Sequence, residues 1–135
     1  MIHIHSVAVL GAGTMGAQIA AHLANAGLPV LLLDLDRDTA AEGLRRATKL
    51  RPDPFFAHDV AHLISLGGFD TDLPQLQESD WIIEAVSERL DIKRTLMSKV
   101  EPHRSPQSIV SSNTSGIPIA GIATGRSEGF RKHWL

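Results

Sequence analysis

The sequence predicts an α/β fold: an open, doubly wound parallel β-sheet with helices on both faces, in three layers α/β/α. Short aliphatic runs alternate with stretches of helical spacing along the 135 residues, as in strands joined by crossover helices. One run, Val30 to Leu33, contains no polar residue, which is typical of a strand buried on both faces. Right-handed crossovers then give the strand order 3-2-1-4-5, and the length suits a single domain over residues 1–135.

The first half of the chain is expected to contain three strands and two helices. Asp38 is expected to cap the second helix, which Pro52 and Pro54 end. Residues 51–68 show only a weak pattern for secondary structure. The pair of glycines at their end is expected to interrupt any helix or strand. The expected ranges are residues 2–10, 30–33 and 69–71 for the strands and residues 14–26 for the first helix.

The second half is expected to add two strands and their helices. An apolar strand begins at Trp81, and the helix after it carries apolar residues at helical spacing. Pro118 suits the first turn of a short helix, and Ser127 is expected to cap a last helix that reaches toward Leu135. The expected ranges are residues 81–86 and 108–111 for the strands and about 89–100 for the helix between them.

The glycine-rich turn after the first strand is the most informative segment. Its residues are Gly11, Ala12, Gly13, Thr14, Met15 and Gly16, which match the G-x-G-x-x-G fingerprint of Rossmann-type dinucleotide sites. Gly11 allows the tight turn, Gly13 lets the backbone approach a pyrophosphate, and Gly16 permits close packing of helix on strand. The helix that follows presents unpaired N–H groups and its positive dipole end to the phosphates. A strand before, a helix after and an acidic residue about 20 residues on complete the fingerprint.

That acidic residue is Asp34, at the carboxyl end of the second strand. Its carboxylate would accept hydrogen bonds from the adenosine ribose hydroxyls and repel a 2′-phosphate. The sequence therefore predicts NAD rather than NADP as the cofactor. Arg37 lies close enough to meet a phosphate, but Asp34 has the better position.

Composition excludes several classes of function. The formal net charge is −2 and aromatic residues make up 4%, so nucleic-acid binding has no support. The chain has no cysteine and no metal site is expected, because His3 and His5 lack a third ligand nearby. No apolar run approaches membrane-spanning length and no leader pattern precedes the first strand, so we expect a soluble cytoplasmic protein without a membrane partner.

Two further loops fall at the same sheet edge. Residues 84–93 read Glu-Ala-Val-Ser-Glu-Arg-Leu-Asp-Ile-Lys, and residues 112–116 read Ser-Asn-Thr-Ser-Gly. With the glycine loop, these three segments resemble the NAD-binding domain of the 3-hydroxyacyl-CoA dehydrogenases of fatty-acid β-oxidation over essentially the whole chain. Residues 21–27 and 111–118 resemble most the members that are fused to an enoyl-CoA hydratase domain.

The resemblance implies roles for particular side chains. Met15 would line the cofactor, the backbone from Val86 to Glu88 and the Glu88 carboxylate would meet its nicotinamide half, and Lys93 would contact it from the helix. Ser115 would hydrogen-bond the C3 oxygen of the substrate, and Asn113 would shape the loop. The predicted cofactor-binding residues are therefore Gly11, Ala12, Gly13, Thr14, Met15, Gly16, Asp34, Val86, Glu88, Lys93, Asn113 and Ser115, with Ser115 also the predicted catalytic contact.

Each of these roles has a structural alternative. Glu88 and Lys93 could form an exposed helical pair, and Ser115 could simply cap the helix that contains Pro118. Glu84 is expected to be a strand-end carboxylate rather than a catalytic base. At the level of function, the alternatives are a 3-hydroxyisobutyrate-type dehydrogenase domain and a non-catalytic module that senses NAD.

The resemblance also implies parts that this sequence does not contain. In the family, a following strand carries a histidine that acts as general base, and a separate helical domain helps to hold the acyl-CoA. We therefore expect these 135 residues to bind NAD without turning over 3-hydroxyacyl-CoA. An open edge on the fifth strand would also invite formation of a homodimer.

Overall fold

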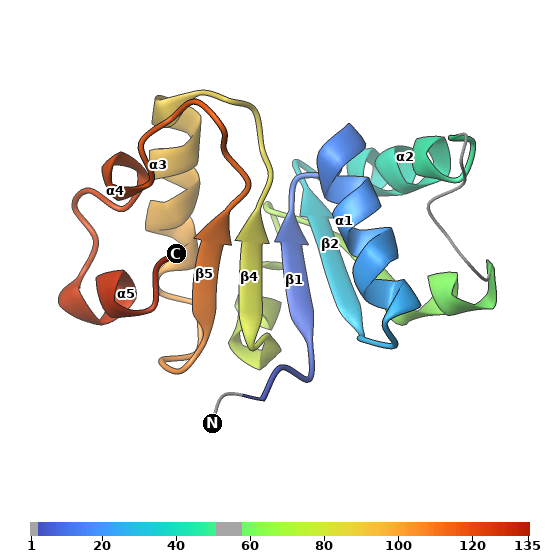
Figure 1. The fold of residues 1–135 in the computed structure, drawn as a ribbon, viewed down its shortest axis with the longest axis horizontal. Coiled ribbons are helices and arrows are strands. Elements are labelled where there is room, and N and C mark those ends of the chain that lie inside the picture. Colours follow the sequence, from blue (N-terminus) through green and yellow to red (C-terminus); the bar gives the residue numbers. More distant parts are fainter. Residues whose placement is uncertain (1–2, 51–57) are drawn as a thin grey trace.

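The computed structural model describes residues 3–50 and 58–135. They form a parallel sheet of order β3-β2-β1-β4-β5, so the predicted fold class and strand order are confirmed. The strands are β1 (Val7–Leu10), β2 (Val30–Asp34), β3 (Ile64–Gly68), β4 (Trp81–Glu84) and β5 (Ile109–Ser112). Helices α1 (Thr14–Asn25) and α2 (Arg37–Ala47) lie toward the β2 end of the sheet, whereas α3 (Leu90–Val100), α4 (Ile119–Ile122) and α5 (Glu128–Lys132) lie toward β5 (Figure 1).

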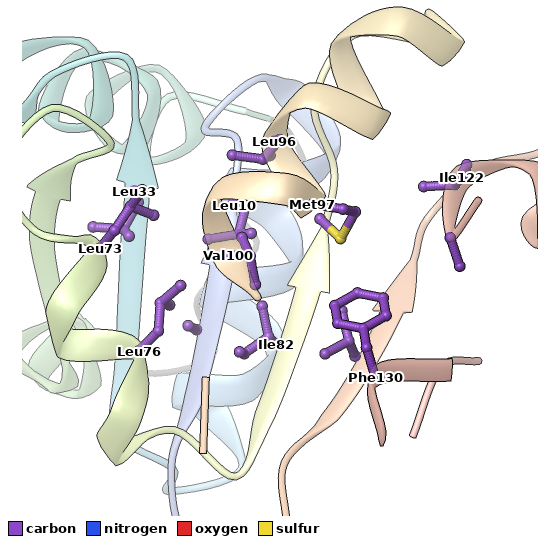
Figure 2. Close-up of a cluster of buried hydrophobic side chains, with 13 residues drawn as sticks. Leu10, Leu33, Leu73, Leu76, Ile82, Leu96, Met97, Val100, Ile122 and Phe130 are labelled. Atoms are coloured by element: carbon purple, nitrogen blue, oxygen red, sulfur yellow. The ribbon is translucent and has the colours of Figure 1, made fainter. Parts of the chain in front are cut away.

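Two hydrophobic clusters lie on the two faces of the sheet, because successive strand residues point to opposite faces. Val7 and Val9 of β1 pack with the alanine-rich face of α1, while Ala8 and Leu10 pack in the cluster that includes α3. Figure 2 shows Leu96, Met97 and Val100 of α3 on this second face, with Phe130 beside them. The three-layer arrangement therefore follows from the period of the apolar residues.

The third strand was expected at residues 69–71, and this expectation is wrong. The strand is Ile64–Gly68, and Gly67 and Gly68 pair in register with Leu33 and Asp34 of β2. A Cβ on Gly68 would lie 2.7 Å from the backbone Cα of Asp36, so this glycine allows close packing at the end of the strand. Short 3-10 helices, η1 (His58–Leu63) and η2 (Leu73–Glu78), flank it.

Several element boundaries also differ from the expected ones. Asp36, not Asp38, caps α2, because its carboxylate accepts a hydrogen bond from the Thr39 amide at 2.7 Å. The first strand begins at Val7 because the amides of His5 and Ser6 bond to the Asp80 side chain before any ladder starts. Pro52 and Pro54 lie outside the described residues.

The edge of β5 is covered at its middle. The amide of Val110 donates to the carbonyl of His133 at 2.9 Å, and the amide of Leu135 donates to the carbonyl of Val110 at 2.8 Å. The last helix ends at Lys132, so the residues after it are free of the helix and lie alongside β5. The edge that was expected to be open is therefore paired at Val110, and the expected homodimer stays a prediction.

Candidate functional site

A cleft of about 730 Å³ opens at the carboxyl edge of the sheet, where all the labelled strand arrows end (Figure 1). It lies beside β1 and β4, the strands at which the sheet order reverses and at which doubly wound sheets bind ligands. Four segments line it: the glycine loop, the end of β2 with Phe69, residues 85–87, and one side of α3 that includes Asp91, Thr95 and Lys99.

The three glycines of the loop differ in what surrounds them. Gly11 has φ +106°, and a Cβ there would lie 2.6 Å from the carbonyl oxygen of Ala85. A Cβ on Gly16 would overlap the carbonyl of Gly11, so helix and loop could not approach as they do. At Gly13, by contrast, no protein atom lies within 4 Å of the Cβ position, and the residue lines the cleft. Gly11 and Gly16 therefore allow close packing, whereas the space beside Gly13 is open to a ligand.

The start of α1 is open to an anion. Its N-cap residue is Gly13, so no side chain caps the helix, and the first turn contains no acidic residue. The early N–H groups and the dipole of a twelve-residue helix therefore face the cleft without a competing carboxylate on the helix itself. Thr14 and Met15 line the same cleft, and Met15 is 54% exposed.

Asp34 also lines the cleft, and its carboxylate already holds the loop. Oδ2 accepts from the amide of Ala12 and Oδ1 accepts from the amide of Leu35, both at 2.7 Å. A carboxylate has about four acceptor positions, so two ribose hydroxyls can still be bound. Arg37, the residue that could favour a phosphate, instead donates to the carbonyl of Leu66 at 3.3 Å.

The loop after β4 rests on a buried ion pair. The Lys93 ammonium lies 2.7 Å from a carboxylate oxygen of Glu84, and the two side chains are 1% and 0% exposed. The same ammonium donates to the carbonyl of Val86 at 3.2 Å and lies 3.5 Å from Glu88. Lys93 is therefore not half of an exposed helical pair, and its direct contact with the cofactor stays a prediction.

Glu88 joins the loops that follow β4 and β5. Its carboxylate accepts from the hydroxyl of Thr114 at 2.6 Å and from the amide of Ser115 at 3.3 Å. The hydrogen bond from Thr114 is the main cause that lowers the pKa of Glu88 below its ordinary value, with smaller contributions from Ser115 and Lys93. The charged form of Glu88 is thus the form that keeps the two loops together.

The remaining predicted residues lie on these loops. Val86 lines the cleft, and its amide donates to Glu84 at 2.7 Å. Asn113 and Ser115 are exposed, and neither they nor Glu88 and Lys93 are among the residues that line the cleft. The backbone amide of Asn113 extends the ladder to the carbonyl of Glu84. Ser115 does not cap α4, because that helix has no side-chain cap.

Sequence reasoning missed three contributors to the site. Thr114 was unassigned although its hydroxyl holds Glu88. Ser112 donates to Glu84 at 2.5 Å, and Gly43 of α2 packs on the glycine loop so closely that a Cβ would overlap the carbonyl of Ala12. The in-register position of Ser112 opposite Glu84 was a usable signal once the strand order was known, whereas helix spacing alone could not place Gly43.

Three other features are absent from the described residues: a histidine in the cleft, a group of metal ligands and a membrane-spanning helix. None of the residues lining the cleft is a histidine. Within residues 3–50 and 58–135, no group of three or more acidic or histidine side chains could hold a metal ion. No helix found there has both the length and the apolar character needed to cross a membrane.

Comparison with known proteins agrees with this geometry. The family described as "3-hydroxyacyl-CoA dehydrogenase, NAD binding domain" matches residues 6–133. A probable 3-hydroxyacyl-CoA dehydrogenase of Deinococcus radiodurans is 48% identical over 98% of this chain and 40% of its own length. A putative trifunctional enzyme of the fatty acid oxidation complex of Rickettsia felis is 36% identical over 98% of this chain and 19% of its own length.

Solved structures agree as well. The (S)-3-hydroxybutyryl-CoA dehydrogenase of Ralstonia eutropha superposes with a TM-score of 0.77 at 28% identity, over 98% of this chain and 48% of that one. This chain therefore spans less than half the length of these relatives. The match over nearly all of its residues shows that the chain belongs to the family of NAD-binding domains of 3-hydroxyacyl-CoA dehydrogenases, with NAD as cofactor.

Proposed function

We propose that this domain supplies the cofactor half of an enzyme that oxidises (S)-3-hydroxyacyl-CoA to 3-oxoacyl-CoA in fatty-acid β-oxidation. The carrying observation is that the glycine loop, Asp34 and residues 85–87 after β4 line one cleft, and that Glu88 joins the loop after β4 to the loop after β5. One relative named as a probable 3-hydroxyacyl-CoA dehydrogenase and one named as a trifunctional enzyme of the fatty acid oxidation complex match nearly the whole chain, which supports the same reaction in the protein to which the domain belongs.

In this proposal each loop has a separate task. The start of α1 and Gly13 hold the pyrophosphate, and Asp34 selects the unphosphorylated ribose. Glu88 and Lys93 define the nicotinamide end, and the exposed hydroxyl of Ser115 is free to bond the C3 oxygen of the substrate, because Glu88 holds only its amide. NAD supplies the hydride acceptor when bound.

We further propose that these 135 residues bind NAD without turning over a substrate. Removal of the C3 hydroxyl proton needs a general base, and no histidine is among the residues that line the cleft. A module that senses NAD would behave in the same way in a binding assay. Dehydrogenation of 3-hydroxyacyl-CoA by a longer form of the chain would distinguish the two, because a sensor would remain inactive.

The proposal is tested by calorimetric titration of the purified chain with NADH and with NADPH. We expect tighter binding of NADH, and in Asp34→Asn we expect that preference to fall by about tenfold or more because charge-assisted hydrogen bonds are lost. Asparagine keeps one acceptor oxygen for the Ala12 amide, while the Leu35 amide loses its partner oxygen. Glu101→Gln is the control, since Glu101 pairs with Arg126 away from the cleft.

Two outcomes would contradict the proposal. Equal affinity for NADH and NADPH in the parent chain would remove the role of Asp34 in cofactor choice. Binding of neither cofactor by a folded chain would show that the glycine loop serves packing alone.

A further inference from the structure

The most deeply buried ionisable groups in the described part of the chain are Glu84 and Lys93, which lie beneath the cleft and are both fully buried. No role in binding has been assigned to Glu84. A buried ion pair is weak support for stability, since its desolvation cost can exceed its Coulombic gain. The position of Glu84 therefore calls for an explanation beyond folding.

Glu84 contacts three segments at once. It is the last residue of β4, beside the point where the strand order reverses. One carboxylate oxygen accepts from the amide of Val86 and from the Lys93 ammonium, both at 2.7 Å. The other accepts from the hydroxyl of Ser112, its in-register neighbour on β5, at 2.5 Å.

Through these partners Glu84 is linked to the loop after β4 and to the loop after β5. Lys93 also holds the carbonyl of Val86 and lies 3.5 Å from Glu88. Glu88 in turn holds Thr114 and Ser115, the residues just beyond Ser112. The contacts form a closed ring from Glu84 through Lys93 and Glu88 to residues 114–115, and back along the chain to Ser112.

We propose that Glu84 is a positioning residue, whose buried carboxylate fixes the loop after β4 against the loop after β5 so that the nicotinamide end of the site is preformed. This inference rests on the proposed function of the cleft. Glu84 itself does not line the cleft, so it acts through Lys93, Val86 and Ser112. Preorganisation of this kind preserves affinity because fewer groups must be ordered when the ligand binds.

The test uses the full chain, labelled with ¹⁵N, in four variants beside the parent. Glu84→Gln removes the charge at nearly constant shape, and Ser112→Ala removes only the contact to β5. The double variant Glu84→Gln with Lys93→Met replaces the ion pair by a neutral pair, which is expected to recover stability. Glu101→Gln breaks a partly buried ion pair away from the cleft and serves as the matched control.

Three readouts are compared: NADH affinity by calorimetry, the amide resonance of Ser115 without cofactor, and the midpoint of thermal unfolding. We expect Glu84→Gln to weaken NADH binding by about tenfold or more and to shift the Ser115 amide. Ser112→Ala should act in the same direction with a smaller effect. The double variant should recover the thermal midpoint, which shows that the lost stability comes from the unpaired ammonium, whereas Glu101→Gln should lower the midpoint and leave NADH binding unchanged.

A purely structural role for Glu84 would give a different pattern. NADH affinity and the Ser115 amide would then stay at parent values in folded Glu84→Gln and in Ser112→Ala, and the proposal would be overturned. If Glu84→Gln does not fold, Ser112→Ala decides by the same criteria, because it leaves Lys93 in place. If the parent chain binds no NADH, the proposed function fails, but the Ser115 amide still reports whether Glu84 positions the loop.

Discussion

At the scale of single residues, the ionisation of Glu88 controls the contact between two loops. The pKa of this carboxyl is lowered from its ordinary value of 4.5, first by the hydroxyl of Thr114. A lowered pKa means that the charged form is favoured in the folded state, so the contact contributes stability above pH 4.5 and loses it as pH falls through the folded-state pKa. The loops should therefore stay joined at neutral pH and separate only in acid.

We expect Thr114→Val to raise the pKa of Glu88 toward its ordinary value, because the principal hydrogen bond to its charged form is removed. An NMR titration of the side-chain carboxyl carbons would measure this change. Glu42 provides an internal control, since its pKa is lowered by a hydrogen bond from Arg45 on α2 and should be the same in both proteins. An unchanged pKa of Glu88 would mean that Thr114 does not hold the carboxylate in solution.

At the scale of elements, the approach of α2 to the glycine loop depends on Gly43. Glycine inside a helix costs about 1 kcal/mol relative to alanine, so Gly43→Ala would be expected to stabilise an isolated helix. Here a Cβ would overlap the carbonyl of Ala12, whose amide Asp34 holds. We expect Gly43→Ala to destabilise the fold by about 1–3 kcal/mol, the range for overpacking, and to weaken NADH binding through the displaced loop.

The matched control is Gly129→Ala in α5, where the nearest atom to the added Cβ is 4.0 Å away. This change should be neutral or stabilising by a few tenths of a kcal/mol. Chemical denaturation of both variants measures the difference. A more stable Gly43→Ala protein would show that α2 can shift away from the loop at little cost.

The same element illustrates what sequence could and could not predict. Fold class and strand order followed from apolar periodicity, and the glycine loop with Asp34 followed from spacing, because these signals are local. Gly43, Thr114 and the true third strand were missed because their roles arise from contacts between distant segments. A pair of glycines signals a turn in isolation, yet Gly67 and Gly68 lie in a strand that packs against β2 and Asp36.

At the scale of the whole molecule, the stability of the open sheet as a separate chain depends on how its edges are covered. An unpaired edge is a template for association with another chain. Residues 133–135 reduce this tendency at β5, where Val110 bonds to both His133 and Leu135. Trp134 anchors residues 133–135 to the rest of the domain. Its indole donates to the carbonyl of Ile119 at 3.0 Å, and its ring stacks on Phe130.

Removal of Trp134 and Leu135 should therefore open the edge and promote self-association. We expect the shortened chain to unfold at a lower temperature, since an aromatic pair contributes about 0.5–1.5 kcal/mol beyond its buried area, and to sediment as a mixture whose mass rises with concentration. Trp134→Phe separates the two causes, because it keeps the backbone bond from Leu135 while removing the indole donor; it should lose stability but sediment like the parent. If the shortened chain sediments like the parent at every concentration, the exposed edge of β5 is not what governs association, and any homodimer must form through another surface.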